Sequence, residues 1–144
     1  MNRRAFVRRA SGALSATPLA VLLAGCAALA ARVVPVRDGK LHLALSHYPE
    51  LETAGGALKL APTGFEHPVY VMTLGRDAFA ALSPICTHLG CTVEIQGSRI
   101  VCPCHGSTYD REGRVLQGPA ERALTRYSTS IEDGVLVIDL RARA

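Results

Sequence analysis

The chain has 144 residues, of which 49% are hydrophobic and 5% aromatic, a size that fits one modest domain with a terminal extension. Its formal net charge is +4, but four arginines lie within the first nine residues and the rest of the chain is balanced. Because no basic patch with interleaved aromatic residues follows, the composition argues against a nucleic-acid-binding protein.

The first 26 residues, MNRRAFVRRASGALSATPLAVLLAGC, have the pattern of a targeting segment: arginines first, then an uncharged run from Ala10 to Ala31. The start RRAFV resembles the twin-arginine export signal, and LAGC, residues 23–26, resembles the cleavage box of bacterial lipoproteins, which would leave a lipidated Cys26 at the N-terminus. An uncleaved membrane anchor is the alternative, although Pro18 and many small residues weaken it. Both alternatives place the protein on the periplasmic side of the bacterial cytoplasmic membrane, where disulfides persist.

Residues 27–39 are predicted to be a tether of at most ~45 Å, and residues 40–144 to be the folded domain. Apolar and polar residues alternate over short stretches that turn signals separate, such as RDG at 37–39 and EDG at 132–134. This pattern predicts an antiparallel β sandwich or barrel. The predicted strands are 40–46, 57–61, 68–74, 79–83, 98–102, 124–131 and 135–140.

Two boxes combine cysteine with histidine: CTHLGC at residues 86–91 and CPCHGS at residues 102–107. If all four cysteines and both histidines were ligands, six groups would crowd one small metal centre. We therefore expect two cysteines and two histidines to bind metal, and the remaining two cysteines to bridge the loops. We expect Cys91 and Cys104, the second cysteine of each box, to occupy equivalent trailing positions in the two loops.

The boxes resemble, letter for letter, those of Rieske iron–sulfur proteins of the high-potential kind found in cytochrome bc complexes. The similarity extends through GRVLQGPA at 113–120 to about residue 140. It implies an all-β, Rieske-type fold with a cluster-binding loop subdomain and one 2Fe-2S cluster. The implied roles are Cys86 and Cys102 as ligands of one iron, His88 and His105 as ligands of the other, and Cys91 with Cys104 as a disulfide.

Replacing two thiolates by two neutral imidazoles raises the charge of an oxidised 2Fe-2S cluster from −2 to zero. Such centres have reduction potentials of about −150 to +300 mV, against about −400 mV for centres with four cysteines. The resemblance also implies that Ser107 and Tyr109 donate hydrogen bonds to cluster sulfurs. Such bonds favour the upper part of that range.

In Rieske proteins of this kind, the two histidine ligands lie at the solvent-exposed tip of the protein. By this resemblance His105 accepts a quinol hydrogen bond and His88 lies on the exit side, so that electron and proton uptake are coupled. Leu89 would belong to an apolar docking collar, and Gly118, Pro119 and Ala120 would cover the cluster. The chain would then have no catalysis of its own, and would relay electrons from a quinol-oxidising cytochrome b-type subunit to a c-type cytochrome or similar acceptor.

Three alternatives remain at this stage. A structural zinc site could use two cysteines and two histidines, but alternating Cys-His pairs are not its usual order. A soluble, oxygenase-type Rieske ferredoxin generally lacks the bridging cysteines and an export leader. The Rieske small subunit of an exported molybdenum oxidase, similar to arsenite oxidase, fits the leader but fits the boxes less well. Whether the protein works in a full cytochrome bc complex or alone is also open, because the tether lacks a clear membrane helix followed by a hinge.

Overall fold

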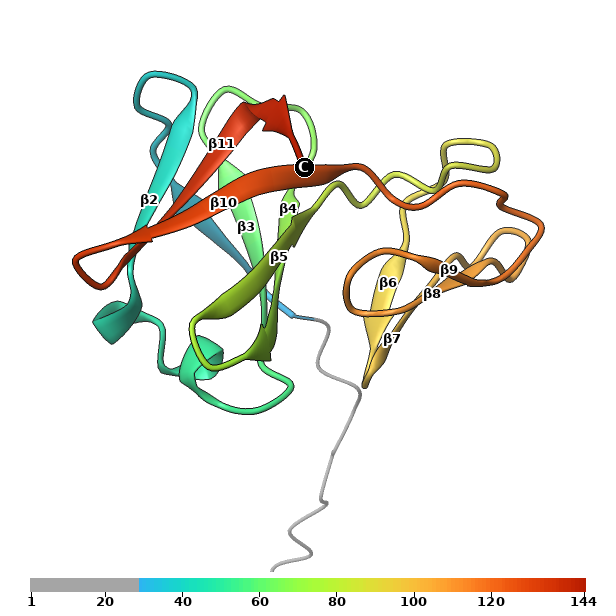
Figure 1. Cartoon of the computed structure of the whole chain (residues 1–144). Helices are drawn as coiled ribbons and strands as arrows, with labels where there is room; N and C mark the ends of the chain where they lie inside the picture. The colour runs from blue at the N-terminus through green and yellow to red at the C-terminus, as the bar shows by residue number, and fades with distance from the viewer. Residues whose placement is uncertain (1–28) are drawn as a thin grey trace, which may run out of the picture.

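The computed structural model describes residues 29–144 as a β protein with two lobes, which Figure 1 shows side by side. We call residues 29–83 and 124–144 the base lobe, and residues 84–123 the loop lobe. The predicted all-β fold class is confirmed, since the helical segments in the described part are two short 3₁₀ turns, η1 (Leu45–His47) and η2 (Pro49–Glu52). No helix within residues 29–144 is long and apolar enough to cross a membrane.

The base lobe is a curved sheet in which the described strands follow the order β1-β3-β4-β5-β10-β11-β2. All neighbouring pairs are antiparallel except β1 with β3. Each predicted stretch of this lobe overlaps one of its strands, and β1 is the strand that was not predicted. The bounds of the strands are β1 (Ala31–Val34), β2 (Lys40–Ala44), β3 (Ala57–Pro62), β4 (Val69–Gly75), β5 (Ala78–Leu82), β10 (Arg126–Glu132) and β11 (Val135–Arg143).

Aspartate and glycine form the tight turns that the sequence predicts. In the β10–β11 hairpin, Asp133 and Gly134 have φ values of 48° and 76°, and Asp38 and Gly39 before β2 have 51° and 76°. Two successive positive φ values define the turn that best continues the twist of a two-strand hairpin. Glycine adopts this conformation freely and aspartate tolerates it, which explains why these dipeptides stand at these positions.

β1 corrects the predicted start of the domain. Residues 27–39 are not all tether, because Ala31–Val34 pairs in parallel with β3 and the side chain of Val34 is 4% exposed in the base-lobe core. Short alternating patterns signal strands poorly when only one residue of four is buried. The sheet therefore begins nine residues earlier than residue 40.

The loop lobe is a small four-stranded sheet of very short strands. It contains β6 (Glu94–Gln96), β7 (Arg99–Val101), β8 (Thr108–Tyr109) and β9 (Val115–Gln117), which pair in chain order. Sequence alternation predicted β7, but β6, β8 and β9 were missed because two or three residues do not establish a period.

Strands β4 and β5 are buried on both faces and join the two lobes. Val69 and Val71 point into the core of the base lobe, while Tyr70 and Met72 pack against the loop lobe. Side chains alternate across a strand, so the run VYVM serves two cores at once. The second core includes Tyr109 at 0% exposure, which reaches it from β8.

Arg111, two residues after the end of β8, adds a polar link between the lobes. Its guanidinium donates to the carbonyl oxygens of Thr73 at 3.3 Å and Gly97 at 3.4 Å, and to that of Gly56. Gly56 and Thr73 belong to the base lobe and Gly97 to the β6–β7 turn. One planar side chain thus fixes three backbone segments, a task suited to its five fixed donors.

Asp110 organises the turn between β8 and β9. Its Oδ1 accepts the N–H groups of Glu112 and Arg114, both at 2.9 Å, and its Oδ2 accepts from Arg114 Nε at 2.8 Å. Partial burial opposes ionisation of Asp110, but these bonds outweigh it and lower the pKa of the carboxyl below its usual value. The carboxylate therefore stabilises the fold above its unfolded pKa, and this contribution is lost as the pH falls through the lower, folded pKa.

We predict that Asp110→Asn lowers the free energy of unfolding by about 1–2 kcal/mol at neutral pH, because the amide keeps the turn but loses the charged acceptor. The gap to wild type in the thermal midpoint should be constant from about pH 8 to about pH 5 and shrink below about pH 4. Glu112→Gln is the matched control, because Glu112 meets Arg114 at 3.1 Å through exposed side chains only. A gap that stays constant down to the acid limit of the folded protein would contradict this account.

Candidate metal centre

The two boxes occupy the two loops of the loop lobe that lie before β6 and between β7 and β8. In each loop the leading cysteine begins the same turn. The N–H of Gly90 donates to the carbonyl of Cys86 at 2.9 Å, and the N–H of Gly106 to that of Cys102 at 3.0 Å. Both glycines have positive φ, 83° and 78°, which a side chain would disfavour.

A second pair of corresponding backbone hydrogen bonds joins the two ends of each loop. The N–H of Cys86 donates to the carbonyl of Cys91, and the N–H of Cys102 to that of Ser107, both at 2.8 Å. The two loops therefore have matching backbones, with Cys91 and Ser107 at corresponding positions. The expectation that Cys91 and Cys104 hold equivalent places is wrong: Cys104 corresponds to His88 instead.

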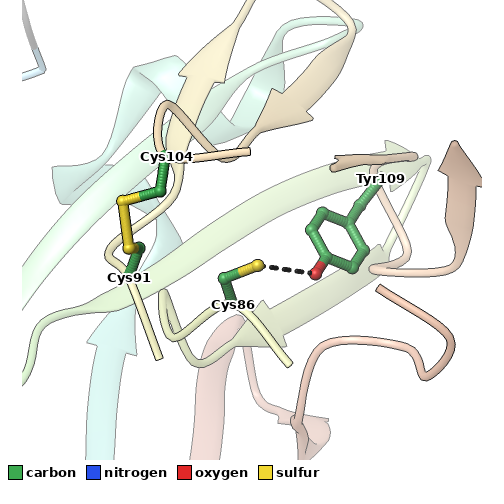
Figure 2. The surroundings of a disulfide bond; sticks show 4 residues. All are labelled: Cys86, Cys91, Cys104 and Tyr109. Carbon is green, nitrogen blue, oxygen red and sulfur yellow. Dashed lines mark hydrogen bonds between the residues drawn. A yellow bond between two sulfur atoms is a disulfide. The ribbon is translucent and has the colours of Figure 1, made fainter. Parts of the chain in front are cut away.

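The bridge between the loops is a disulfide that joins these unequal positions. Cys91 and Cys104 are bonded, with their Cα atoms 6.5 Å apart, so the predicted pairing is confirmed (Figure 2). Cys104 is exposed and Cys91 is half-buried, and the thiol of Cys102 lies within 4.8 Å of both sulfurs of the bridge. The disulfide therefore joins the two loops next to Cys102, a candidate ligand.

The four residues predicted to bind metal lie in these two loops. Within residues 29–144 the free cysteines are Cys86 and Cys102, which are buried at 2% and 1% exposure. The rings of His88 and His105 meet edge to face with their centroids 5.0 Å apart. The Nδ1 atom of His88 is buried without a hydrogen-bond partner, as expected of an atom reserved for another ligand.

This donor set fits an iron–sulfur centre. Two thiols and two imidazoles are the groups that hold a 2Fe-2S cluster of the mixed type, with each pair of like ligands on one iron. The disulfide keeps the other two thiols of the loops from competing as ligands. The assignment of Cys86, Cys102, His88 and His105 as ligands accordingly stays a prediction that the observed donors support.

Tyr109 contacts one of these thiols from the second core. Its Oη lies 3.2 Å from Cys86 Sγ (Figure 2). The same oxygen accepts the N–H of Thr87 at 3.3 Å. Burial and the adjacent Cys86 raise the pKa of Tyr109, which favours the protonated hydroxyl that a donor to sulfur requires. Burial opposes ionisation of the Cys86 thiol, but hydrogen bonds from Tyr109 foremost, and also from the backbone of His88 and from Cys102 and Ser107, lower its pKa.

Ser107 is completely buried at the end of the second box. Its Oγ accepts the N–H of Ala120 at 3.0 Å, which leaves the hydroxyl proton available to donate elsewhere. This bond also attaches the segment 118–120 to the box. Ala120 is buried at 4% exposure, whereas Gly118 and Pro119 are exposed.

Thr87 is a site residue that the sequence interpretation did not single out. Besides its N–H bond to Tyr109, its hydroxyl donates to the carbonyl of Arg122 at 2.5 Å. It thereby ties the first box to the chain that follows residue 120. Its position between Cys86 and His88 was the one sequence feature that pointed to it. A threonine in a loop is not a typical metal ligand or catalytic residue, so this position alone did not predict a role.

Leu89 and His105 are exposed side chains of the two boxes. Leu89 is 69% exposed, and it corresponds in the matching turns to His105, which is also exposed. His88 is half-buried, so the two imidazoles differ in their access to solvent. The predicted lipidation site Cys26 lies outside the described residues.

Comparison with known proteins gives a consistent result. The profile of the Rieske [2Fe-2S] domain matches residues 49–128. The cytochrome b6-f complex iron-sulfur subunit of Trichodesmium erythraeum is 43% identical over 74 residues, which are 49% of this chain and 41% of that protein. The subunit of the same description from Chlorobaculum tepidum is 32% identical over 110 residues, 75% of this chain and 60% of that protein. The chain thus spans about half the length of the curated relatives it matches.

Among solved structures, the cyanobacterial plasma membrane Rieske protein PetC3 of Synechocystis is similar with a TM-score of 0.53 and 35% identity, over 63% of this chain and 92% of that chain. The soluble domain of the Rieske protein II (soxF) from Sulfolobus acidocaldarius matches with a TM-score of 0.55 at 19% identity, over 69% of this chain and 76% of that chain. The latter similarity concerns the fold alone.

We predict that Tyr109→Phe and Ser107→Ala each lower the reduction potential of the loaded centre without loss of iron. A hydroxyl that donates to sulfur stabilises the extra negative charge of the reduced state more than the oxidised state. Charge-assisted hydrogen bonds contribute about 1.5–3 kcal/mol, which corresponds to an upper bound of about 65–130 mV for one electron.

Tyr70→Phe is the matched control for this electrode titration. Tyr70 lies in the same core and donates to the carbonyl of Val93 at 2.8 Å, but it has no hydrogen bond to a cysteine. It should lower the thermal midpoint and leave the potential unchanged. Wild-type potentials in both Tyr109→Phe and Ser107→Ala would remove the hydroxyls from the tuning of the centre.

Proposed function

The chain belongs to the family of Rieske [2Fe-2S] domains, which bind one 2Fe-2S cluster, and on this premise we propose that it is a membrane-tethered, high-potential electron-transfer protein. It accepts electrons from a quinol at a cytochrome b-type subunit and passes them to a c-type cytochrome or similar acceptor. The observation that carries the proposal is that the same two loops hold two free, buried thiols, Cys86 and Cys102, and the imidazoles of His88 and His105, whose rings meet edge to face.

In this proposal Cys86 and Cys102 hold one iron and His88 and His105 the other. The bound cluster supplies a centre that takes up and releases one electron. The chain supplies the rest: burial keeps both thiols away from water, the Cys91–Cys104 bond fixes the loops, and Tyr109 donates to Cys86.

His105 is the residue that meets the quinol. Its ring is exposed at the loop end, while that of His88 is half-buried, so His105 is the accessible acceptor for a quinol hydroxyl proton. An imidazole that binds metal through one nitrogen keeps the other for hydrogen bonding. His88 faces the exit side. Uptake of the electron is thereby coupled to proton transfer at the imidazole.

Leu89 and the segment 118–120 form the surface that docks on the quinol-oxidising subunit. Leu89 is the most exposed large apolar side chain of the loop lobe within the described residues, beside a histidine that requires contact with substrate. Apolar residues at the rim exclude water from the hydrogen bond to His105. The similarity to subunits of cytochrome b6-f complexes supports a cytochrome-containing partner.

Leu89→Glu tests this docking surface. We expect iron and sulfide content and the reduction potential of the variant to be unchanged, because Leu89 makes no contact that holds the core. Quinol-driven reduction of c-type cytochrome in membranes should fall by about tenfold or more, which corresponds to about 1.4 kcal/mol.

Phe65→Glu is the control, since Phe65 is 47% exposed on the base lobe, away from the boxes. It should leave the rate at the wild-type value. Equal rates in wild type and Leu89→Glu would reject docking through this surface, and equal losses in the two variants would show that any exposed acid impairs the reaction.

The targeting segment is proposed to end in lipid attachment at Cys26 on the periplasmic side of the membrane. The twin-arginine-like start and the LAGC box support this, and export of a folded domain suits a protein whose cluster must be inserted first. Mass spectrometry of the membrane fraction should find a diacylated N-terminal Cys26. A chain that still begins at Met1 would establish the uncleaved anchor instead.

A further inference from the structure

β1 is an edge strand of the base-lobe sheet, and the side chains of one of its faces contact the rest of the lobe. The Arg32 guanidinium forms an ion pair with Glu50 and lies 5.4 Å from the ring centroid of Tyr48. Val34 is buried, and its carbonyl accepts the N–H of Thr63 at 3.0 Å. The strand is therefore part of the folded lobe and has a defined orientation.

The opposite face of β1 is apolar and uncovered. Leu29, which precedes the strand, is 42% exposed, and Val33 is 77% exposed, the highest fraction among the large apolar side chains of residues 29–144. Ala31 between them is also exposed. In the parallel register Ala31 lies beside Lys59 and Val33 beside Ala61, so that a lysine is the charged neighbour on this face.

The chain length between this strand and the membrane is very short. Because β1 starts at Ala31, four residues lie between it and Cys26, and the five residue steps span at most ~18 Å, far less than the ~45 Å predicted for a tether that ends at residue 39. An uncleaved anchor gives the same result, since the uncharged run itself extends to Ala31. Figure 1 shows the chain entering the base lobe directly along this blue strand.

We propose that the outer face of β1, formed by Leu29, Ala31 and Val33, lies on the phospholipid surface of the membrane. This inference rests on the membrane tether of the proposed function and gives that tether an orientation. The apolar side chains enter the headgroup boundary, where amphipathic surfaces bury their apolar face. The base lobe is thus seated on the bilayer along one edge.

The chain contains no tryptophan, so a single introduced tryptophan reports its own surroundings. Full-length Val33→Trp, reconstituted in phosphatidylethanolamine and phosphatidylglycerol vesicles, is compared with Ile131→Trp. Ile131 is an exposed apolar residue of β10, close in sequence to the β10–β11 turn. Both variants carry the same preference of tryptophan for interfaces, so a difference between them reports orientation.

Lipids brominated in the acyl chains should quench Val33→Trp several-fold more than Ile131→Trp, and aqueous iodide should show the reverse order. Equal quenching of the two variants, or iodide access at Val33 with the protein still bound to vesicles, would overturn the proposed surface alone. Failure of the full chain to float with vesicles would instead reject the membrane tether, and with it this inference.

Discussion

The covalent contact between the two box loops is the constraint on which the site depends. The loop lobe has about forty residues and strands of two or three residues, too few to hold two exposed loops by packing alone. The Cys91–Cys104 bond joins the loops beside the thiol of Cys102. Each loop is closed at its base by its own backbone hydrogen bonds, so the disulfide mainly fixes one loop relative to the other.

The loop lobe packs against strands β4 and β5, whose side chains contribute to the cores of both lobes. Tyr70 and Met72 of β4 point to the loop lobe and their neighbours point to the base core, so the lobe that carries the candidate ligands packs on a sheet that is buried on both faces. Tyr109 connects the core of the loop lobe to Cys86, and Arg111, two residues later, binds carbonyls of both lobes. The segment from Tyr109 to Arg111 thus links the surroundings of Cys86, a candidate ligand, to the packing of both lobes.

Sequence reasoning reached the features that carry local signals. Alternation found β2, β3, β4, β5, β7, β10 and β11, and the similarity of the boxes to a known family gave the disulfide pairing that the structure confirms. It failed where the determinant is tertiary. β1 has a single buried residue, Val34, and Thr87 acts through a carbonyl 35 residues away, so neither leaves a pattern along the chain. The unequal places of Cys91 and Cys104 emerged only from the matching turns of the two loops.

The correction at β1 changes the mechanics of the proposed electron relay. With the proposed lipid attachment at Cys26, a tether of thirteen residues would let the domain move over tens of ångströms, whereas a sheet edge that begins five residues after Cys26 would keep the base lobe at the bilayer. The boxes lie in the other lobe, which is attached to the base lobe through β4, β5 and Arg111. Movement of the centre towards a partner would then have to come from rotation about the short segment before Ala31. With the outer face of β1 on lipid, that rotation is restricted as well, and a partner in the same membrane must present its docking surface at a nearly fixed height.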